Sequence, residues 1–253
     1  MADILDPRLP VSQSALSGVD LTPAKPLPRS LLILLTCGTV GGLLYTTMYL
    51  IEGVTRPDFD AWQQTISVLS LGPGGWVQQV DFVFLGLVTL ALAFVWRQIL
   101  KGGVGATWYP IMRCLEGLGL IGAGFFSVDP APGYPKGAIL TSTLHGTIHT
   151  ICALVVITSI AVGYFVLARR FAQEPRWGRG WAVYSVICGL LTLFLFAIFL
   201  NEPDSAIAGL IERLATSGVS RPFDLTVLVR LWLGAGFTSP GLSNGVLRKE
   251  QGV

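Results

Sequence analysis

The chain has 253 residues, of which 52% are hydrophobic and only 13% are charged. An ordinary soluble domain carries about 25% charged residues, so this composition excludes a soluble enzyme and an intrinsically disordered chain. The net charge of +2 is too small to indicate nucleic-acid binding. The four cysteines lie inside apolar runs, so neither a disulfide framework nor a thiolate zinc site is indicated.

The apolar residues gather into six segments that predict membrane-spanning helices. A bilayer core of about 30 Å needs about 20 apolar residues in a helix, because only a helix satisfies its own backbone groups in lipid. The predicted spans cover residues 31–50, 77–95, 109–126, 139–167, 181–200 and 223–237. The last is the weakest, because it is short and contains Arg230. The predicted fold class is therefore an all-α bundle of six transmembrane helices.

The basic residues predict how the bundle is oriented. Eleven lysines and arginines fall in the two tails and in the second and fourth connections, against four in the other connections. Because basic residues favour the cytoplasmic side, we expect a cell membrane protein with both termini in the cytoplasm. Residues 1–29 would form a disordered cytoplasmic tail, 30–238 the six-span domain, and 239–253 a second cytoplasmic tail.

Two of the outer connections carry apolar residues at helical spacing. These residues are Phe59, Trp62, Ile66 and Leu69 in the first connection, and Ile207, Leu210, Ile211 and Leu214 in the fifth. The spacing predicts a short amphipathic helix in the outer interface for each connection. In the second of these helices, Glu212 and Arg213 are expected to turn away from the apolar face.

The only two histidines, His145 and His149, are four residues apart and would share one face of the fourth span. One hypothesis is a divalent metal such as zinc, held by both imidazoles. Zinc needs at least three protein ligands, and a carboxylate such as Asp129 would have to complete the set. The other hypothesis is a hydrogen-bonded pair that ties the helix to the outer loops. The run 141–143 supplies residues that can cap the helix start.

The third predicted span contains a charged pair and a run of glycines. Glu116 lies inside the span, where a carboxylate often marks an ion or proton pathway. Arg113 is three residues earlier, so an ion pair within the helix is the simpler interpretation. The run 117–122 matches the letters of a dinucleotide-binding loop but lacks the required strand and turn context. We expect its glycines, and the pair Gly38 and Gly42, to let helices approach closely.

An ordered set of motifs resembles a known family. The motifs are RPDFD at 56–60, TISVLSLGP at 65–73, GLGLIGAGFF at 117–126, DP at 129–130, GYP at 133–135, LHG at 144–146 with His149, and GLIERL at 209–214. On these residues the chain resembles the bacterial multi-pass membrane family catalogued as domain of unknown function 998 (DUF998). The resemblance covers about 31–214 and implies a six-span bundle with its motif residues on the outer side. It implies no particular activity.

A more distant similarity concerns the membrane hydrolases of the ceramidase and adiponectin-receptor type. That group combines serine, aspartate and a His-x-x-x-His pair around zinc. Ser67, Asp129, His145 and His149 match these ingredients in kind, but the third histidine ligand of that group is missing here. By this analogy, Ser67 and Asp129 are candidate catalytic residues.

Three functions remain open at this point. The first is an outer-leaflet site of Asp129, His145 and His149, with Ser67 nearby, that binds or hydrolyses a lipid-like molecule. If the site is catalytic, a metal-bound water would be the nucleophile. The second is a small-solute or proton-coupled transporter using Glu116 and Arg230. The third is a non-catalytic membrane scaffold. In each case the expected partners are the lipid bilayer and, for the first, a lipid-like ligand.

Overall fold

A computed structural model describes residues 27–175 and 177–236 of the chain. The predicted tails over 1–29 and 239–253 lie outside these residues, apart from 27–29, and so does the last residue of the predicted sixth span. Within the described residues the fold is all-α, as predicted, and contains no β-strand.

Long helices account for most of the described chain. They are α1 (Arg29–Thr55), α2 (Trp76–Ile99), α3 (Trp108–Phe125), α4 (Leu144–Gln173), α5 (Arg179–Asn201) and α7 (Val219–Gly236). The short elements are the 3₁₀ helix η2 (Ser67–Ser70), α6 (Ala208–Arg213) and the π-helix η3 (Leu214–Gly218), and the last two lead directly into α7. Four helices, α1, α2, α4 and α5, are long and apolar enough to cross a membrane. The other two, α3 and α7, have 18 residues each.

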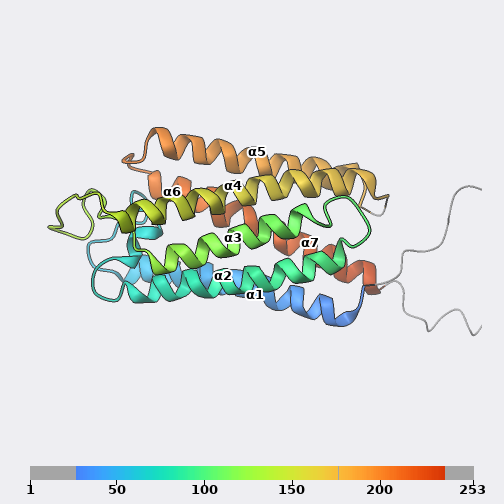
Figure 1. Ribbon diagram of the computed structural model, residues 1–253. Coiled ribbons are helices and arrows are strands. Elements are labelled where there is room, and N and C mark those ends of the chain that lie inside the picture. Colours follow the sequence, from blue (N-terminus) through green and yellow to red (C-terminus); the bar gives the residue numbers. More distant parts are fainter. Residues whose placement is uncertain (1–26, 176, 237–253) are drawn as a thin grey trace, which may run out of the picture.

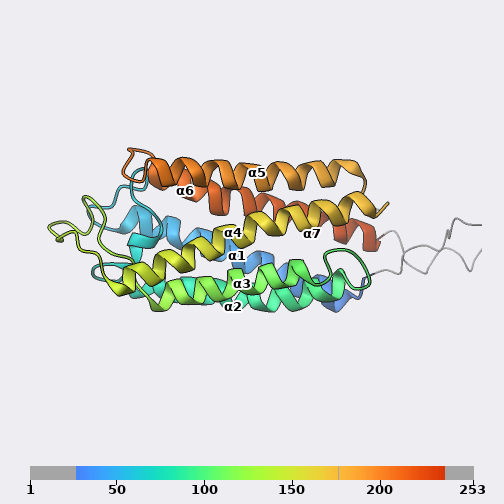
Figure 2. The ribbon, with the colours of Figure 1, turned by 45° about the horizontal axis from the view of Figure 1, so that its top comes forward.

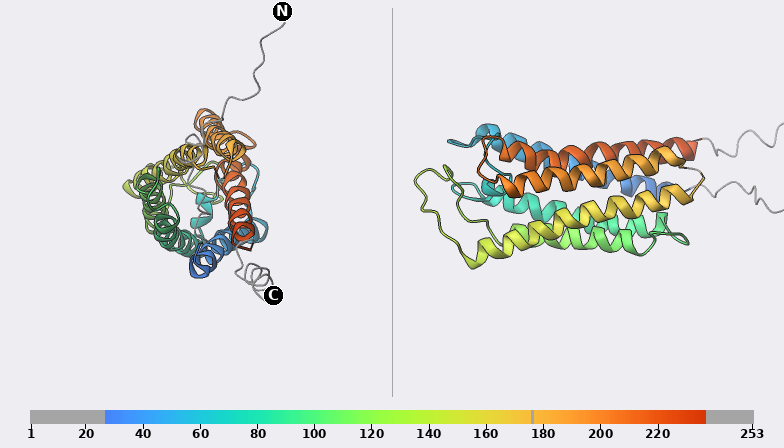
Figure 3. Two further views of the ribbon diagram at one scale, coloured as in Figure 1. Left: turned by 90° about the vertical axis from the view of Figure 1, so that its right-hand side faces the viewer. Right: turned by 90° about the horizontal axis from the view of Figure 1, so that it is seen from above.

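The long helices form a closed ring, which is seen end-on in Figure 3. Each helix contacts the next along the chain, from α1 through α5 to α7, and α7 closes the ring against α1. The start of α1 and the end of α7 lie at the same end of the bundle (Figure 1). The long connections 56–75 and 126–143 gather at the opposite end (Figure 2), which we call the loop end. The two connections therefore lie together at the end of the bundle opposite the start of α1.

The side chains of the bundle are distributed as expected for a protein surrounded by lipid. Large apolar side chains face outward along the helices, with Leu87 57% exposed and Phe94 62% exposed. Polar side chains such as Gln78, Thr89 and Thr192 are buried inside. A soluble domain shows the reverse pattern, so this chain is a membrane-embedded protein.

Glycines set the spacing of two neighbouring helices, as predicted for the run 117–122. A Cβ atom on Gly117 would lie 2.8 Å from the carbonyl oxygen of Gly86 in α2. A Cβ atom on Gly119 would lie 2.9 Å from the carbonyl oxygen of Cys152 in α4. Both distances are too short for any side chain, so α3 packs backbone to backbone against both neighbours.

The fourth predicted span is displaced along the chain. It was expected over 139–167, whereas α4 begins at Leu144 and ends at Gln173. The start is fixed by Thr143, whose hydroxyl accepts a hydrogen bond from the Gly146 N–H at 3.0 Å and so caps the helix. The apolar residues before it, including Ile139, lie in the preceding connection and are exposed.

The predicted interfacial α-helix over residues 59–69 of the first connection is wrong. The helix predicted for the fifth connection is right only in part. Residues 59–66 form turns, followed by η2, and Ile66 and Leu69 are buried inside the loop end. The fifth connection does contain a helix, α6, but Glu212 lines the interior and Arg213 is buried. These two side chains turn inward because the folded-in connection presents backbone groups that need hydrogen-bond partners.

Candidate functional site

The connection 56–75 folds back into the loop end and carries Ser67 to the interior of the ring. Ile66, Val68 and Leu69 are almost fully buried, at 2%, 2% and 0% exposed. They anchor η2 against the helices as a core segment would. Ser67 itself, at the start of η2, is half-buried. The apolar residues on each side of Ser67 therefore fix where its hydroxyl can lie.

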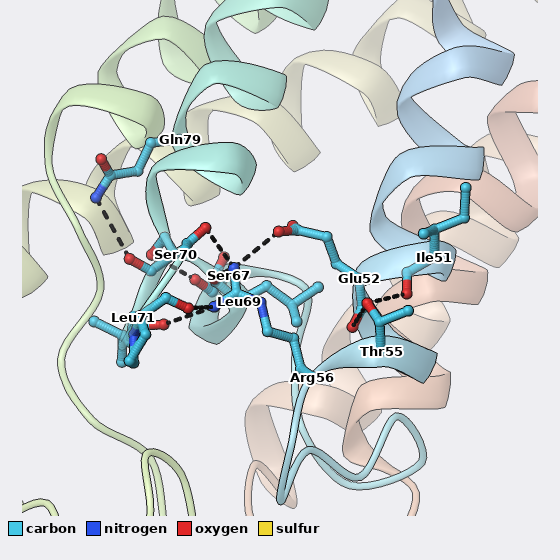
Figure 4. Close-up of polar contacts among 11 residues, drawn as sticks. Ile51, Glu52, Thr55, Arg56, Ser67, Leu69, Ser70, Leu71 and Gln79 are labelled. Atoms are coloured by element: carbon cyan, nitrogen blue, oxygen red, sulfur yellow. Dashed lines mark hydrogen bonds and ion pairs between the residues drawn. The ribbon is translucent and has the colours of Figure 1, made fainter.

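One arginine holds the far side of this connection to α1, as Figure 4 shows. The Arg56 guanidinium pairs with Glu52 Oε1 at 2.8 Å. It also donates hydrogen bonds to the carbonyl oxygens of Leu69 at 3.2 Å and Gly74 at 2.6 Å, and to that of Pro73. Arginine suits this role because its planar guanidinium presents five N–H donors at fixed angles.

Two charged side chains of α6 hold the near side of the connection. Glu212 Oε2 accepts a hydrogen bond from the backbone N–H of Ile66 at 2.7 Å. Arg213 Nη1 donates to the carbonyl oxygens of Ala61 at 2.8 Å and Gln64 at 2.9 Å. The segment that bears the serine is thus fixed on both sides by charge-assisted hydrogen bonds, which are the strong ones.

Ser67 and His149 form a hydrogen-bonded pair across the interior. Their Oγ and Nε2 atoms lie 2.9 Å apart, although the residues are 82 positions apart in the chain. His149 Nδ1 lies 2.7 Å from the carbonyl oxygen of Phe126 and 3.1 Å from that of Ala123. Carbonyl oxygens only accept, so Nδ1 carries the hydrogen, and in the neutral imidazole Nε2 accepts from the serine hydroxyl.

The setting of His149 also explains why its ring is fixed. Its two carbonyl partners belong to the last turn of α3 and the residue after it, where helix carbonyls lack partners within the helix. His149 is 2% exposed, and its imidazole meets the phenyl ring of Phe82 edge-on, with the two centroids 6.0 Å apart. The hypothesis of a hydrogen-bonded histidine pair is therefore met for His149, whereas His145 makes an aromatic contact.

Asp129 and His145 lie in other local environments. Asp129 accepts two hydrogen bonds from Thr143, one from the hydroxyl at 2.6 Å and one from the backbone N–H at 3.0 Å. The hydroxyl contact in particular lowers the pKa of Asp129 below its ordinary value. His145 is exposed and its ring meets that of Phe126, with centroids 5.4 Å apart. Asp129 thus braces the capped start of α4.

Of the four predicted site residues, the structure joins Ser67 to His149 and gives Asp129 and His145 different partners. In the part of the chain that the structure describes, no group of three or more His, Cys, Asp or Glu side chains could hold a metal ion. Zinc needs at least three protein ligands, so the zinc hypothesis draws no support from this geometry.

A cavity of about 70 Å³ lies inside the ring beside the pair. Ser67 and His149 line it, and the apolar side chains of Phe82, Leu120 and Val156 form part of its wall. A hydroxyl bonded to an imidazole acceptor, beside a partly apolar cavity, supplies the nucleophile and the base of an acyl-transfer site.

The charged residues of the alternative hypothesis are placed apart from each other. Arg113 and Glu116 form the predicted ion pair, at 2.8 Å, and both are buried. Glu116 lines the central cavity, whereas Arg230 lines a groove between α5 and α7. The helical ion pair is therefore confirmed.

Sequence reasoning missed three residues that hold the site together, namely Arg56, Glu212 and Arg213. It counted them as charges of outer loops, although all three lie within motifs that carry the family resemblance. The available signal was their position at helix ends: Arg56 directly follows α1, and Glu212 and Arg213 end α6.

Comparison with known proteins places the chain in a family. A search of curated proteins and a search of solved structures each found no match to the chain. A family model described as "Protein of unknown function (DUF998)" matches residues 39–220, well over half of the chain. That region holds Ser67, His149 and every side chain that positions them, and on this match the protein belongs to the DUF998 family.

Proposed function

We propose that this protein is a membrane-embedded serine hydrolase or acyltransferase that acts on an ester of a lipid-like molecule. Ser67 is the nucleophile and His149 is its general base. The observation that carries the proposal is the 2.9 Å contact between Ser67 Oγ and His149 Nε2, with Nδ1 held by backbone carbonyls. A nucleophile bonded to a base that is itself oriented by a third group is the general pattern of such sites.

The backbone carbonyl of Phe126 takes the place that a carboxylate has in a catalytic triad. It fixes the tautomer and the orientation of the imidazole. It carries no full negative charge, so it stabilises the imidazolium less than an aspartate would. We therefore expect slow turnover compared with a serine hydrolase that has a full triad.

The same proposal includes a topology. All six long helices cross the membrane, the loop end faces outward, and both termini lie in the cytoplasm of a cell. Three features support it: α3 and α7 complete a closed ring with the four apolar helices, the described chain begins and ends at one end of the bundle (Figure 1), and the basic connections lie at that end.

The experiment is active-site labelling of the purified full chain in lipid nanodiscs with a fluorophosphonate probe. We expect phosphonylation of Ser67, located by mass spectrometry of the labelled peptide. Ser67→Ala should abolish the labelling. His149→Asn should reduce it strongly, because asparagine keeps an N–H donor near the Nδ1 position but removes the Nε2 acceptor.

Ser159→Ala is the matched control, since Ser159 is a buried serine on the same helix as His149. It should leave the labelling of Ser67 unchanged. Labelling that His149→Asn does not slow would contradict the role of His149 as a base. A protein whose Ser67 never reacts would contradict the proposed function itself.

Proton-coupled transport is the second candidate, because the carboxyl group of Glu116 lines the central cavity beside the site. Intramembrane carboxylates that face a cavity often relay protons. The test is dye quenching in proteoliposomes under an imposed pH gradient. Proton flux that Glu116→Gln abolishes and Ser67→Ala leaves intact would favour transport over hydrolysis.

A further inference from the structure

We infer that the acyl group transferred by Ser67 is short, of acetyl to propionyl size, and that it lies in the cavity inside the ring. This inference rests on the proposed function and names its substrate class: an amphiphile that carries a short-chain ester. The rest of the substrate stays outside the cavity.

The cavity lies where the acyl group of a Ser67 ester would be placed. It is lined by the serine and the imidazole together, so a carbonyl carbon attacked by Oγ lies at its edge. Phe82, Leu85 and Leu120 of its wall are 5–6% exposed and belong to one packed cluster at the loop end. Such walls accept a hydrocarbon group and hold their shape.

The size of the cavity decides between a short and a long acyl chain. An engineered cavity of about 150 Å³ in another protein binds benzene, which has six carbon atoms. The volume here is about 70 Å³, roughly half as large. By that scale it accommodates about three heavy atoms, which corresponds to an acetyl or propionyl group. A chain of eight carbons is larger than this volume.

Charged groups limit any extension of the chain along the interior. Glu116, Glu212 and Arg221 also line the cavity. Glu212 is held by the backbone N–H of Ile66, at 2.7 Å. Glu116 pairs with Arg113 at 2.8 Å, and Arg221 with Asp224 at 3.4 Å. A long hydrocarbon chain in this direction would have to lie against buried ion pairs, which costs free energy without compensation. The apolar part of the cavity is therefore short.

The reaction proceeds through an ester of Ser67. As Oγ attacks the carbonyl carbon, its proton passes to His149 Nε2 and then to the leaving alcohol oxygen, and the substrate C–O bond breaks. Water then attacks the acylated serine, giving its proton to Nε2, and the short-chain acid leaves as Ser67 regains its hydrogen. An acceptor alcohol in place of water would receive the acyl group instead.

The test compares p-nitrophenyl acetate, butyrate and octanoate as substrates of the full chain in nanodiscs, with Ser67→Ala as the background. We expect kcat/KM to fall at least about tenfold from acetate to octanoate, since a single methylene that a pocket cannot accept is worth about 10-fold or more. Intact mass after reaction with acetate should show an acetylated protein that Ser67→Ala lacks.

A change in the wall should change the preference. Leu120→Ala enlarges the cavity and should raise the butyrate-to-acetate ratio of kcat/KM several-fold. Leu92→Ala is the matched control, because Leu92 is equally buried, at 5% against 6% exposed, but belongs to the other core cluster. It should leave the ratio unchanged.

The outcomes separate the inference from the function on which it rests. Octanoate hydrolysis as fast as acetate hydrolysis, or an unchanged ratio in Leu120→Ala, overturns the short-acyl inference and leaves the serine hydrolase in place. No Ser67-dependent hydrolysis of any ester, together with no fluorophosphonate labelling, overturns both.

Discussion

The two ends of the ring are held together by different forces. At the end where α1 begins, a large apolar cluster fills the interior, and Leu32, Leu167 and Phe171 are completely buried there. The aromatic side chains of this cluster pack closely, and the ring centroids of Phe171 and Trp177 are 4.2 Å apart. At the loop end, charged side chains bind the backbone of the 56–75 connection. The first end is stabilised mainly by apolar packing, whereas the loop end combines a smaller apolar cluster with directional hydrogen bonds to the connection.

The difference teaches where a precise site can be built. Apolar packing tolerates small shifts, because dispersion contacts have no preferred direction. A hydrogen bond of a buried charge fixes both distance and angle, and the loss of one partner leaves the other charge uncompensated. The loop end therefore tolerates fewer structural shifts, and the same hydrogen bonds fix the position of Ser67 relative to His149.

The largest expected effect comes from Arg56→Ala. Arg56 and Glu52 are 10% and 7% exposed at their side chains, and removal of one partner of a buried pair costs about 3–5 kcal/mol. We also expect Ser67 to lose its reactivity in the molecules that stay folded. The backbone carbonyls of Leu69, Pro73 and Gly74 would lose their hydrogen-bond donor, so the connection would no longer hold Ser67 in place. Thermal unfolding in detergent and fluorophosphonate labelling measure the two effects.

A double variant sharpens this prediction. Glu52→Gln combined with Arg56→Ala removes the uncompensated charge, so part of the lost stability should return. Labelling of Ser67 should not return, because the carbonyls still lack their donor. Normal labelling in the single variant would show that the connection holds its place without Arg56.

Leu167→Ala tests the packed end in the same way. Leu167 is 0% exposed within the apolar cluster, and such a truncation costs about 2–5 kcal/mol. The labelling rate of Ser67 per folded molecule should stay at the wild-type value, since the cavity left behind lies at the other end. A parallel fall in labelling would mean that the two ends are coupled rather than separate.

The helices of both ends could be predicted from the sequence, because their signal is local. Apolar runs predicted every long helix, although the run for α7 was short, and most boundaries of α1, α2, α3 and α5 lie within a few residues of the prediction. The error at the start of α4 arose because the apolar residues 139–140 continue the run although the helix begins after its cap at Thr143. Hydropathy does not distinguish a buried helix from an apolar loop.

The sequence predicted which residues belong to the site but not which of them contact each other. Ser67 and His149 were both candidates, but nothing local links residues 82 positions apart. Their contact depends on the inward fold of the 56–75 connection, and that fold depends on Glu212 and Arg213, which come 146 and 149 residues after their partners. Helical spacing predicts that Glu212 and Arg213 point away from the apolar face of their helix. Neither segment alone shows that the other would fold against it and bury these side chains.

Gly117→Ala should have an intermediate effect, at the boundary between the two ends. The added Cβ atom would lie 2.8 Å from the Gly86 carbonyl oxygen and 2.9 Å from Leu90 Cγ, and overpacking of this kind costs about 1–3 kcal/mol. Gly180→Ala is the control, because that helical glycine has nothing within 4 Å of its Cβ position. It should be neutral or slightly stabilising. Equal stabilities of the two variants would contradict a backbone contact between α2 and α3.

The smallest effect is expected from Asp129→Asn, and it concerns pH. The Thr143 hydroxyl, and then its backbone N–H, hold the pKa of Asp129 below its ordinary value of 3.8. A carboxyl whose pKa is lower in the folded state stabilises the fold above the unfolded-state pKa, and this contribution disappears as pH falls through the folded-state pKa. The wild type should therefore lose a small amount of stability as the pH falls from about 4 to the lower folded-state pKa. Asp129→Asn should show no such loss, because it has no carboxyl group to titrate.

In Thr143→Ala most of this pH-dependent loss should be absent, since the variant removes the stronger donor. Thermal unfolding across this pH range measures all three proteins. An increment of the same size in wild type and Asp129→Asn would mean that this brace at the start of α4 contributes nothing to the loop end.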